Sequence, residues 1–263
     1  MLPIDAQTMA EVAPAFSGAK AAAQARIISE VGAALRRTLE EYGIDTRLRI
    51  AHFLGQTCHE SAGFRTTVEF ADGTSYEARK DLGNTEPGDG PRFKGRGLLQ
   101  LTGRANYRDY GKALKLDLEK QPEVAARPVV SLRIACEYWK RRKINADCDQ
   151  DDVVAVTRKI NGGVNGIAER RLFTSRAKTA LSRIEGIRLS GSPDQAAGTV
   201  ILQRGSKGEA VAELQRKMRA LGFMLGVDGD FGPATETAVA RFQQDKGLTV
   251  DGIAGTETWG ALG

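Results

Sequence analysis

Hydrophobic positions in the first part of the chain recur at helical spacing. Ile28, Val31, Leu35 and Leu39 lie three or four residues apart, which places them on one face of a helix. Gly43 follows them as a helix end. The pattern therefore predicts helices rather than strands in this region.

The same spacing predicts four further helices before residue 190. The first begins at Asp45 or Thr46, carries the stripe Ala51, Leu54 and Cys58, and ends near Gly63. The other three are expected around residues 132–139, 151–160 and 167–184. Between residues 64 and 97 the periodicity gives way to Gly, Asp, Asn, Pro and Thr. A long irregular stretch of this kind is typical of a functional cleft.

The last third of the chain has a different organisation. Residues 191–198 are small, polar and non-periodic, which predicts a linker between domains at 1–190 and 199–263. Segments 227–232 and 250–255 both read V-D-G-x-x-G at an offset of 23 residues, each followed by a helix-forming run. With an earlier helix around residues 211–221, these repeats predict a small three-helix domain. The expected fold class is mostly α.

Composition narrows the possible classes of protein. With 263 residues, 41% hydrophobic and 27% charged, the chain is expected to form two soluble domains, and a monomer is expected. Neither a signal peptide nor an apolar run long enough for stable membrane insertion is recognised, so synthesis in a cytoplasm is expected. Cys58, Cys136 and Cys148 have no CxxC spacing and are expected to be reduced. With two histidines, no metal site is expected, and no organic cofactor is implied.

Positive charge is concentrated before residue 200. Residues 1–199 carry a formal charge of +6 and residues 200–263 carry −1. A basic body suits a polyanionic partner such as an acidic cell wall, although ordinary solubilising charge explains it equally well. Nucleic acid is not the expected partner, because no platform of interleaved aromatic and basic residues occurs.

Two carboxylates near the irregular stretch are candidates for acid–base chemistry. Glu60 follows His59, and Glu69 lies nine residues later. Glycoside hydrolysis needs one carboxyl that is protonated and one that is ionised. A glutamate at a helix end is, however, more often a solvated charge. A zinc-peptidase HExxH motif is excluded, because Gly63 occupies the position of its second histidine.

Two glycine-rich segments are candidates for binding sugar. Segment 95–107 combines buried leucines with Gln100, Thr102, Asn106 and Tyr107, a mixture that suits sugar amides and hydroxyls. Segment 160–166 places Asn161 among glycines. The alternatives are a buried turn for the first segment and helix-terminating turn chemistry for the second.

Four features carry a resemblance in sequence order: segment 51–64, Glu69, segment 88–107 and segment 160–166. Together they closely resemble the family-19 glycoside hydrolases, most of all the lysozyme-like endolysins of bacteriophages. The resemblance covers residues 45–185 and implies a lysozyme-like α-helical catalytic domain. Residues 199–263 resemble a peptidoglycan-binding module of the type fused to cell-wall hydrolases.

The resemblance implies roles for individual residues. Glu60 matches the general acid, Glu69 the second carboxylate, and Thr102 the hydroxyl that helps to hold the attacking water. Gln100 and Asn161 match substrate-contacting positions.

The other implied contacts are less direct. Asn106 and Tyr107 are expected to contact substrate with the rest of their segment. Glu77 lies on a loop that is shorter than in plant chitinases, and it is kept as a substrate contact and as the rival of Glu69 for the base.

By the same resemblance, the expected reaction is cleavage of the β-1,4 bond between N-acetylmuramic acid and N-acetylglucosamine with inversion. The expected partner is bacterial peptidoglycan. The enzyme would be made in the host cytoplasm and would lyse the host after release to the cell wall in the periplasm. The alternatives are a chitinase and a non-catalytic wall-anchoring protein.

Overall fold

The computed structural model describes residues 1–190 and 201–262, and describes side chains to residue 185 and again from residue 201. The described residues are mostly helical, as predicted. Contacts divide the chain into two compact units, Met1–Ala177 and Lys178–Gly263. The expected linker, residues 191–198, lies outside the described residues, so the domain bounds 1–190 and 199–263 stay a prediction.

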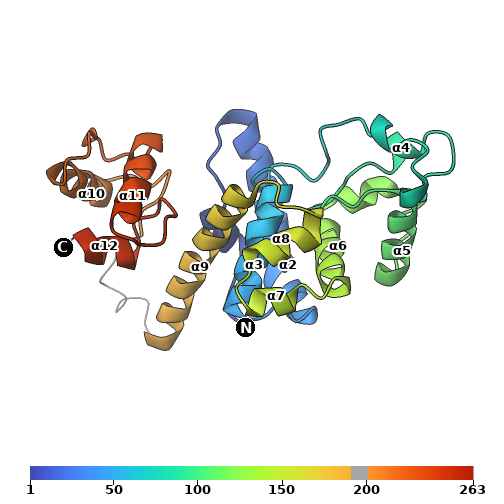
Figure 1. The fold of residues 1–263 in the computed structure, drawn as a ribbon, viewed down its shortest axis with the longest axis horizontal. Coiled ribbons are helices and arrows are strands. Elements are labelled where there is room, and N and C mark those ends of the chain that lie inside the picture. Colours follow the sequence, from blue (N-terminus) through green and yellow to red (C-terminus); the bar gives the residue numbers. More distant parts are fainter. Residues whose placement is uncertain (191–200, 263) are drawn as a thin grey trace. The chain divides into compact units, whose positions relative to one another are not determined.

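The N-terminal unit and the helix that leaves it are built from α-helices with short 3₁₀ turns between them (Figure 1). The α-helices are α1 (Ala6–Val12), α2 (Gly18–Glu41), α3 (Arg47–Glu60), α4 (Asp89–Arg92), α5 (Arg104–Leu114), α6 (Pro128–Arg141), α7 (Asn145–Asp149), α8 (Val153–Asn161) and α9 (Ile167–Ser190). The 3₁₀ helices are η1 (Thr74–Tyr76), η2 (Lys80–Leu82) and η3 (Pro122–Ala126).

Helix α3 lies inside the unit and carries Glu60 at its last position. Thr46 caps its first turn, and every side chain from Ile50 to Cys58 is buried. Helices α1, α7 and α8 pack against it, and the Phe53 ring meets Trp139 of α6 edge-on with centroids 5.2 Å apart. The predicted apolar stripe therefore belongs to a helix that is buried on every side, which fixes the position of its end.

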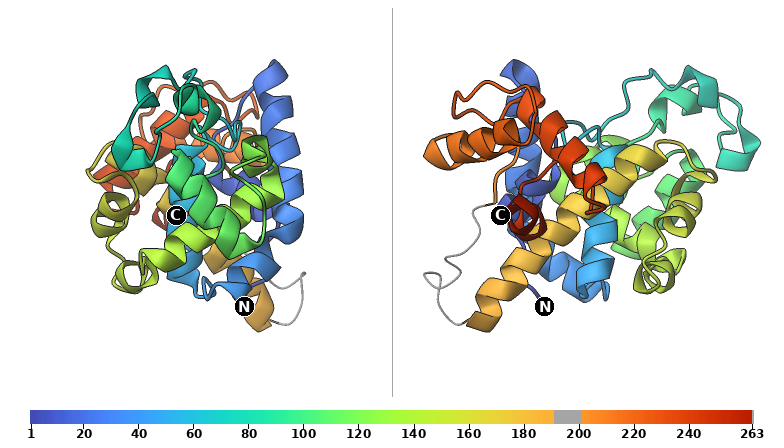
Figure 2. Two further views of the ribbon diagram at one scale, coloured as in Figure 1. Left: turned by 90° about the vertical axis from the view of Figure 1, so that its right-hand side faces the viewer. Right: turned by 60° about the vertical axis from the view of Figure 1, so that its left-hand side comes forward.

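The segment between α3 and α5 is irregular, as predicted, and contains only η1, η2 and α4. Isolated antiparallel bridges join Arg96 to Val68 and to Leu101. The segment forms the outer edge of the unit beside α5, where it is drawn in teal (Figure 1 and Figure 2). A hydrophobic cluster that includes Phe93 and Tyr110 anchors it to α5 and α6.

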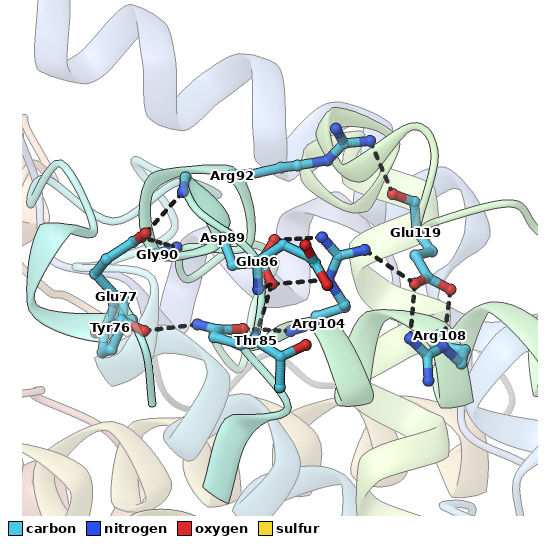
Figure 3. Close-up of polar contacts among 12 residues, drawn as sticks. Tyr76, Glu77, Thr85, Glu86, Asp89, Gly90, Arg92, Arg104, Arg108 and Glu119 are labelled. Carbon is cyan, nitrogen blue, oxygen red and sulfur yellow. Dashed lines mark hydrogen bonds and ion pairs between the residues drawn. The ribbon is translucent and has the colours of Figure 1, made fainter. Parts of the chain in front are cut away.

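An ion network also holds this segment (Figure 3). Asp89 is 1% exposed, and its Oδ2 accepts hydrogen bonds from the backbone amides of Thr85 and Glu86 at 3.0 Å each. Nε of Arg104 donates to the same oxygen at 2.8 Å, and Arg104 also pairs with Glu119. The Arg104 guanidinium lowers the pKa of Asp89, so the carboxylate stays ionised and anchors the segment.

The three cysteines occupy the interior of the N-terminal unit. Cys58, Cys136 and Cys148 are buried and are free cysteines in the structure. Burial raises the pKa of each thiol.

The C-terminal domain contains the three predicted helices, α10 (Glu209–Ala220), α11 (Pro233–Asp245) and α12 (Thr256–Leu262). Pro233 opens α11, where its missing N–H costs no hydrogen bond. Leu214, Met218, Phe231 and Phe242 lie in its hydrophobic core.

A buried glutamine explains the first V-D-G-x-x-G segment. Oε1 of Gln215 accepts hydrogen bonds from the amides of Asp228 and Gly229 at 3.0 Å each. Its Nε2 donates to Oδ1 of Asp228 at 2.8 Å and to Oγ1 of Thr235 at 3.1 Å. One side chain on α10 therefore holds the whole turn.

The second segment uses the same arrangement. Oε1 of Gln243 on α11 accepts from the amides of Asp251 and Gly252 at 3.0 and 2.9 Å. Its Nε2 donates to Oδ1 of Asp251 at 2.7 Å and to Oγ1 of Thr258 at 3.0 Å. The sequence repeat is thus a structural repeat of two turns, each held by one buried glutamine.

Two absences apply to the part of the chain that is described. No helix within residues 1–190 or 201–262 combines the length and the apolar character that a membrane crossing requires. No group of three His, Cys, Asp or Glu side chains in those residues is arranged to hold a metal ion.

Candidate active site

Glu60 is positioned by a side chain from α9. Its Oε1 accepts a hydrogen bond from Nη2 of Arg170 at 2.5 Å, and the Glu60 side chain is 19% exposed while that of Arg170 is 2% exposed. Nη1 of Arg170 donates to Oε1 of Gln56 at 2.5 Å, one turn before Glu60 on α3. Its Nε donates to the carbonyl of Asn165 at 3.0 Å. Arg170 therefore ties the candidate acid to two helices and a loop.

Sequence reasoning missed Arg170. It lies 110 residues from Glu60, and nothing in the local pattern of α9 distinguishes it from the neighbouring arginines. A buried guanidinium is costly unless it is paired, so only the folded contact reveals its partner.

A second pair joins the same helices. Nδ1 of His59 lies 2.5 Å from Oε2 of Glu169. A Cβ added at Gly166, whose φ is +70°, would lie 2.2 Å from the His59 ring. Glycine at this position therefore lets the loop before α9 approach α3 closely.

Asn161 belongs to the surroundings of Glu60. Its Nδ2 donates to the carbonyl of Asn165 at 3.2 Å, the same carbonyl that Arg170 binds. Its Oδ1 accepts from the amide of Gly163 at 2.8 Å. The amide of Asn161 therefore shapes the turn after α8, as the turn interpretation predicted, and this turn lies beside the candidate acid.

Glu69 is held by the irregular segment. Its Oε1 accepts from the amide of Gly95 at 2.6 Å, and its Oε2 accepts from the hydroxyl of Tyr76 at 2.9 Å. A Cβ at Gly95 would lie 2.8 Å from Oε1 of Gln100 and 3.2 Å from Cδ of Glu69, so glycine allows these side chains to meet. Burial, followed by the hydrogen bond to Glu69, raises the pKa of Tyr76.

The structure brings Gln100 close to Glu69, because both side chains lie against Gly95. Nε2 of Gln100 donates to the carbonyl of Gly97 at 2.8 Å. The hydroxyl of Thr102 donates to the carbonyl of Gln100 at 2.9 Å. Gln100 and Glu69 therefore both lie beside Gly95, and Thr102 is linked to the backbone of Gln100.

The structure places Asn106 on the surface, where its contact with substrate stays a prediction, and places Tyr107 in the core. Nδ2 of Asn106 donates to the carbonyl of Thr102 at 2.7 Å, within the first turn of α5. Tyr107 is 0% exposed, its ring packs 5.3 Å from that of Phe93, and its hydroxyl donates to the carbonyl of Lys94 at 2.7 Å. Burial raises the pKa of Tyr107 to about 12. The expectation that Tyr107 contacts substrate does not fit a side chain enclosed in the core.

Glu77 binds the backbone on both of its carboxylate oxygens (Figure 3). Oε1 accepts from the amide of Gly88 and Oε2 from the amide of Gly90, each at 2.7 Å. These amides lie at the start of α4, so Glu77 stabilises this loop. Both oxygens of Glu69 are bound in a similar way, by the amide of Gly95 and the hydroxyl of Tyr76, so the choice between Glu69 and Glu77 as the base stays a prediction.

Comparisons with known proteins match both parts of the chain. The model of glycosyl hydrolase family 19, described as chitinase class I, matches residues 37–161. The model of a peptidoglycan binding domain matches residues 207–262.

Individual proteins share one part or the other. A glycosyl hydrolase family 19 domain-containing protein of Haemophilus influenzae is 33% identical over 168 residues, which cover 52% of this chain and 82% of that protein. The zinc D-Ala-D-Ala carboxypeptidase of Streptomyces albus G is 48% identical over 64 residues, which cover 23% of this chain and only 25% of that enzyme.

Among solved structures, a class IV chitinase of family GH19 from Zea mays aligns with 68% of this chain and 92% of its own, at 21% identity and a TM-score of 0.49. The match to the Haemophilus influenzae protein, 33% identical and covered over 82% of its length, shows that the chain belongs to glycosyl hydrolase family 19, and the chain joins a catalytic domain of that family to a peptidoglycan-binding domain.

Proposed function

We propose that this protein hydrolyses peptidoglycan, cutting the β-1,4 bond between N-acetylmuramic acid and N-acetylglucosamine. The observation that carries the proposal is the presence, in one chain, of a family-19 hydrolase domain and a peptidoglycan-binding domain. Tethering to the wall raises the local concentration of its glycan strands around the catalytic domain.

In the proposed mechanism, Glu60 gives a proton to the leaving oxygen and Glu69 takes a proton from the attacking water. Thr102, whose hydroxyl donates to the carbonyl of Gln100, helps to hold that water. Inversion requires the two carboxyl groups to be about 6.5–9.5 Å apart, so that a water molecule fits between them and the sugar.

The proposed biological setting is that of a bacteriophage endolysin. The protein would be made in the host cytoplasm, reach the wall after release, and lyse the host. The support for this setting is the resemblance of the ordered motifs to endolysins.

Chitin hydrolysis is the second candidate, because the matching catalytic model is that of class I chitinases. The test is to incubate the protein with purified peptidoglycan and with chitin, and to measure reducing sugar from each. Faster release from peptidoglycan is expected, with N-acetylmuramic acid at the new reducing ends by mass spectrometry. Release from chitin alone would establish the second candidate instead.

A further inference from the structure

An arginine beside the candidate base lies against two aromatic rings. Cζ of Arg65 lies over the ring of Phe16 and over the ring of Phe70, 5.3 Å from each centroid. Phe70 is 77% exposed and directly follows Glu69 in the chain. We call Phe16, Arg65 and Phe70 the Arg65 cluster. An exposed aromatic ring one residue from a candidate catalytic carboxylate is well placed to meet a sugar ring.

Backbone contacts fix Phe70 in its exposed position. On one side, the amide of Glu69 donates to the carbonyl of Gly95 at 3.0 Å. On the other, Nζ of Lys94 donates to the carbonyl of Ala71 at 2.9 Å. Phe70 is therefore held on both sides while its ring faces solvent.

Phe16 is tied to the turn that carries Arg65. Nε2 of Gln24 donates both to the carbonyl of Pro14 at 2.9 Å and to the carbonyl of Gly63 at 2.7 Å. This link joins the chain before α2 to the chain after α3. The cluster is thus assembled from two separate segments before any ligand arrives.

The positive charge of Arg65 lacks a carboxylate partner within residues 1–190 and 201–262. Its Nε is buried and makes no hydrogen bond there. A guanidinium that meets aromatic rings through its face keeps its N–H donors in the guanidinium plane, where they can bind a carboxylate. The cluster therefore combines an apolar ring with an unpaired cation.

We propose that the Arg65 cluster is a subsite for the muramoyl sugar of peptidoglycan, with Phe70 against the sugar ring and Arg65 paired with a carboxylate carried by that sugar. The inference rests on the proposed function and adds a reason for its selectivity. N-acetylglucosamine has no carboxylate, whereas muramic acid carries a lactyl group and, through it, the stem peptide. The shared chemistry is a carboxylate attached to the glycan through the lactyl ether.

The experiment compares short glycan strands that differ in their carboxylates. One set keeps its stem peptides, a second has only lactyl carboxylates after amidase treatment, and matched samples of both have their carboxylates converted to neutral methyl amides. kcat and KM are measured for the full-length wild type and for Arg65→Gln, Arg65→Lys, Phe70→Ala and Phe70→Tyr. Arg141→Gln is the control, because Arg141 also lies over an aromatic ring, 4.3 Å from the centroid of Tyr110.

The charge pairing predicts a specific pattern in KM. Arg65→Gln should raise KM about tenfold on at least one carboxylate-bearing strand and leave KM on its methyl amide unchanged. The strand that responds identifies the lactyl group or the stem peptide as the source of the carboxylate. Arg65→Lys should recover part of the loss, and Arg141→Gln should change nothing. Phe70→Ala should raise KM on all strands, because ring stacking does not depend on charge. Phe70→Tyr keeps an aromatic ring, so its KM should stay close to that of the wild type.

Three results would overturn the inference. The first is an equal rise of KM for charged and neutral strands in Arg65→Gln, which would make Arg65 a structural residue. The second is a KM that stays unchanged on every strand, in Arg65→Gln or in Phe70→Ala. The third is a wild type that releases no reducing sugar from any muramoyl strand, which would refute the proposed function as well. Thermal melting of each variant shows whether a change in its KM comes from unfolding.

Discussion

The two candidate catalytic carboxylates are held by opposite means. Glu60 ends a buried helix and is fixed by Arg170, a side chain 110 residues away. Glu69 lies in an irregular segment and is fixed by the amide of Gly95 and the hydroxyl of Tyr76, 26 and 7 residues away. An ion pair between two helices therefore positions the acid, while hydrogen bonds within the irregular segment position the base. Irregular segments open more easily than buried helices, so the base side should be the more mobile.

The largest expected effect comes from the acid. Glu60→Gln keeps the shape of the side chain but removes the proton that it transfers, so turnover of peptidoglycan should fall about 10²-fold or more. Release of reducing sugar measures turnover, and co-sedimentation with peptidoglycan should be unchanged. Near wild-type turnover would show that another group is the acid.

The base side gives a paired test. Glu69→Ala should lower turnover strongly, though by less than Glu60→Gln, and should destabilise its segment by about 1 kcal/mol, because the amide of Gly95 and the hydroxyl of Tyr76 lose their acceptor. Glu77→Ala should leave measurable turnover but destabilise the loop by about 1 kcal/mol, because the amides at the start of α4 lose their acceptor. Turnover and melting are measured on both variants. Loss of activity confined to Glu77→Ala would transfer the role of base to Glu77.

Removing the ion pair between Arg170 and Glu60 should affect turnover less, and stability more, than the substitutions of the carboxylates themselves. Arg170→Met leaves Glu60 and Gln56 without their buried partner, so stability should fall by about 3 kcal/mol and turnover by about tenfold. Denaturant unfolding and reducing-sugar release measure the two effects. The control is Arg171→Met, the same change at the adjacent exposed position. Equal effects in both variants would remove the special role of Arg170.

The smallest effect should appear in the segment around the base at acid pH. Because the pKa of Asp89 is lowered in the fold, its stabilising contribution is complete above its ordinary pKa of about 3.9 and is lost as the pH falls through the folded value. The amides of Thr85 and Glu86, which bind Asp89, should then lose protection against hydrogen exchange before the amides of α3 do. Asp89→Asn should show this loss already at neutral pH. Simultaneous loss in both regions would show that they open as one unit.

The sequence predicted the elements better than the contacts between them. The helical periodicity, the irregular segment and the three C-terminal helices are confirmed, because each follows from local spacing. Thr102 lies close to Gln100 in the chain, whereas the contact between Glu69 and Gly95, 26 residues away, is made by the fold. Arg170 could not be predicted, since its partner lies on another helix and a buried ion pair leaves no periodic pattern.

Two further residues show the same limit. Tyr107 was assigned to substrate because it lies beside polar residues, but the first turn of α5 directs it into the core. The role of Glu77 as the rival base stays a prediction, and the two backbone amides that its carboxylate binds could not be predicted, because only the folded loop brings them together.

The paired glutamines of the C-terminal domain have a consequence for how this domain can evolve. Gln215 and Gln243 each specify a turn through one side chain and a few fixed partners, so positions outside this hydrogen-bond set, such as Val227 and Val250, are not needed to define its shape. Substitutions there can change what the surface recognises while the turn keeps its geometry. Because the arrangement occurs twice, one turn can diverge while the other preserves the original surface.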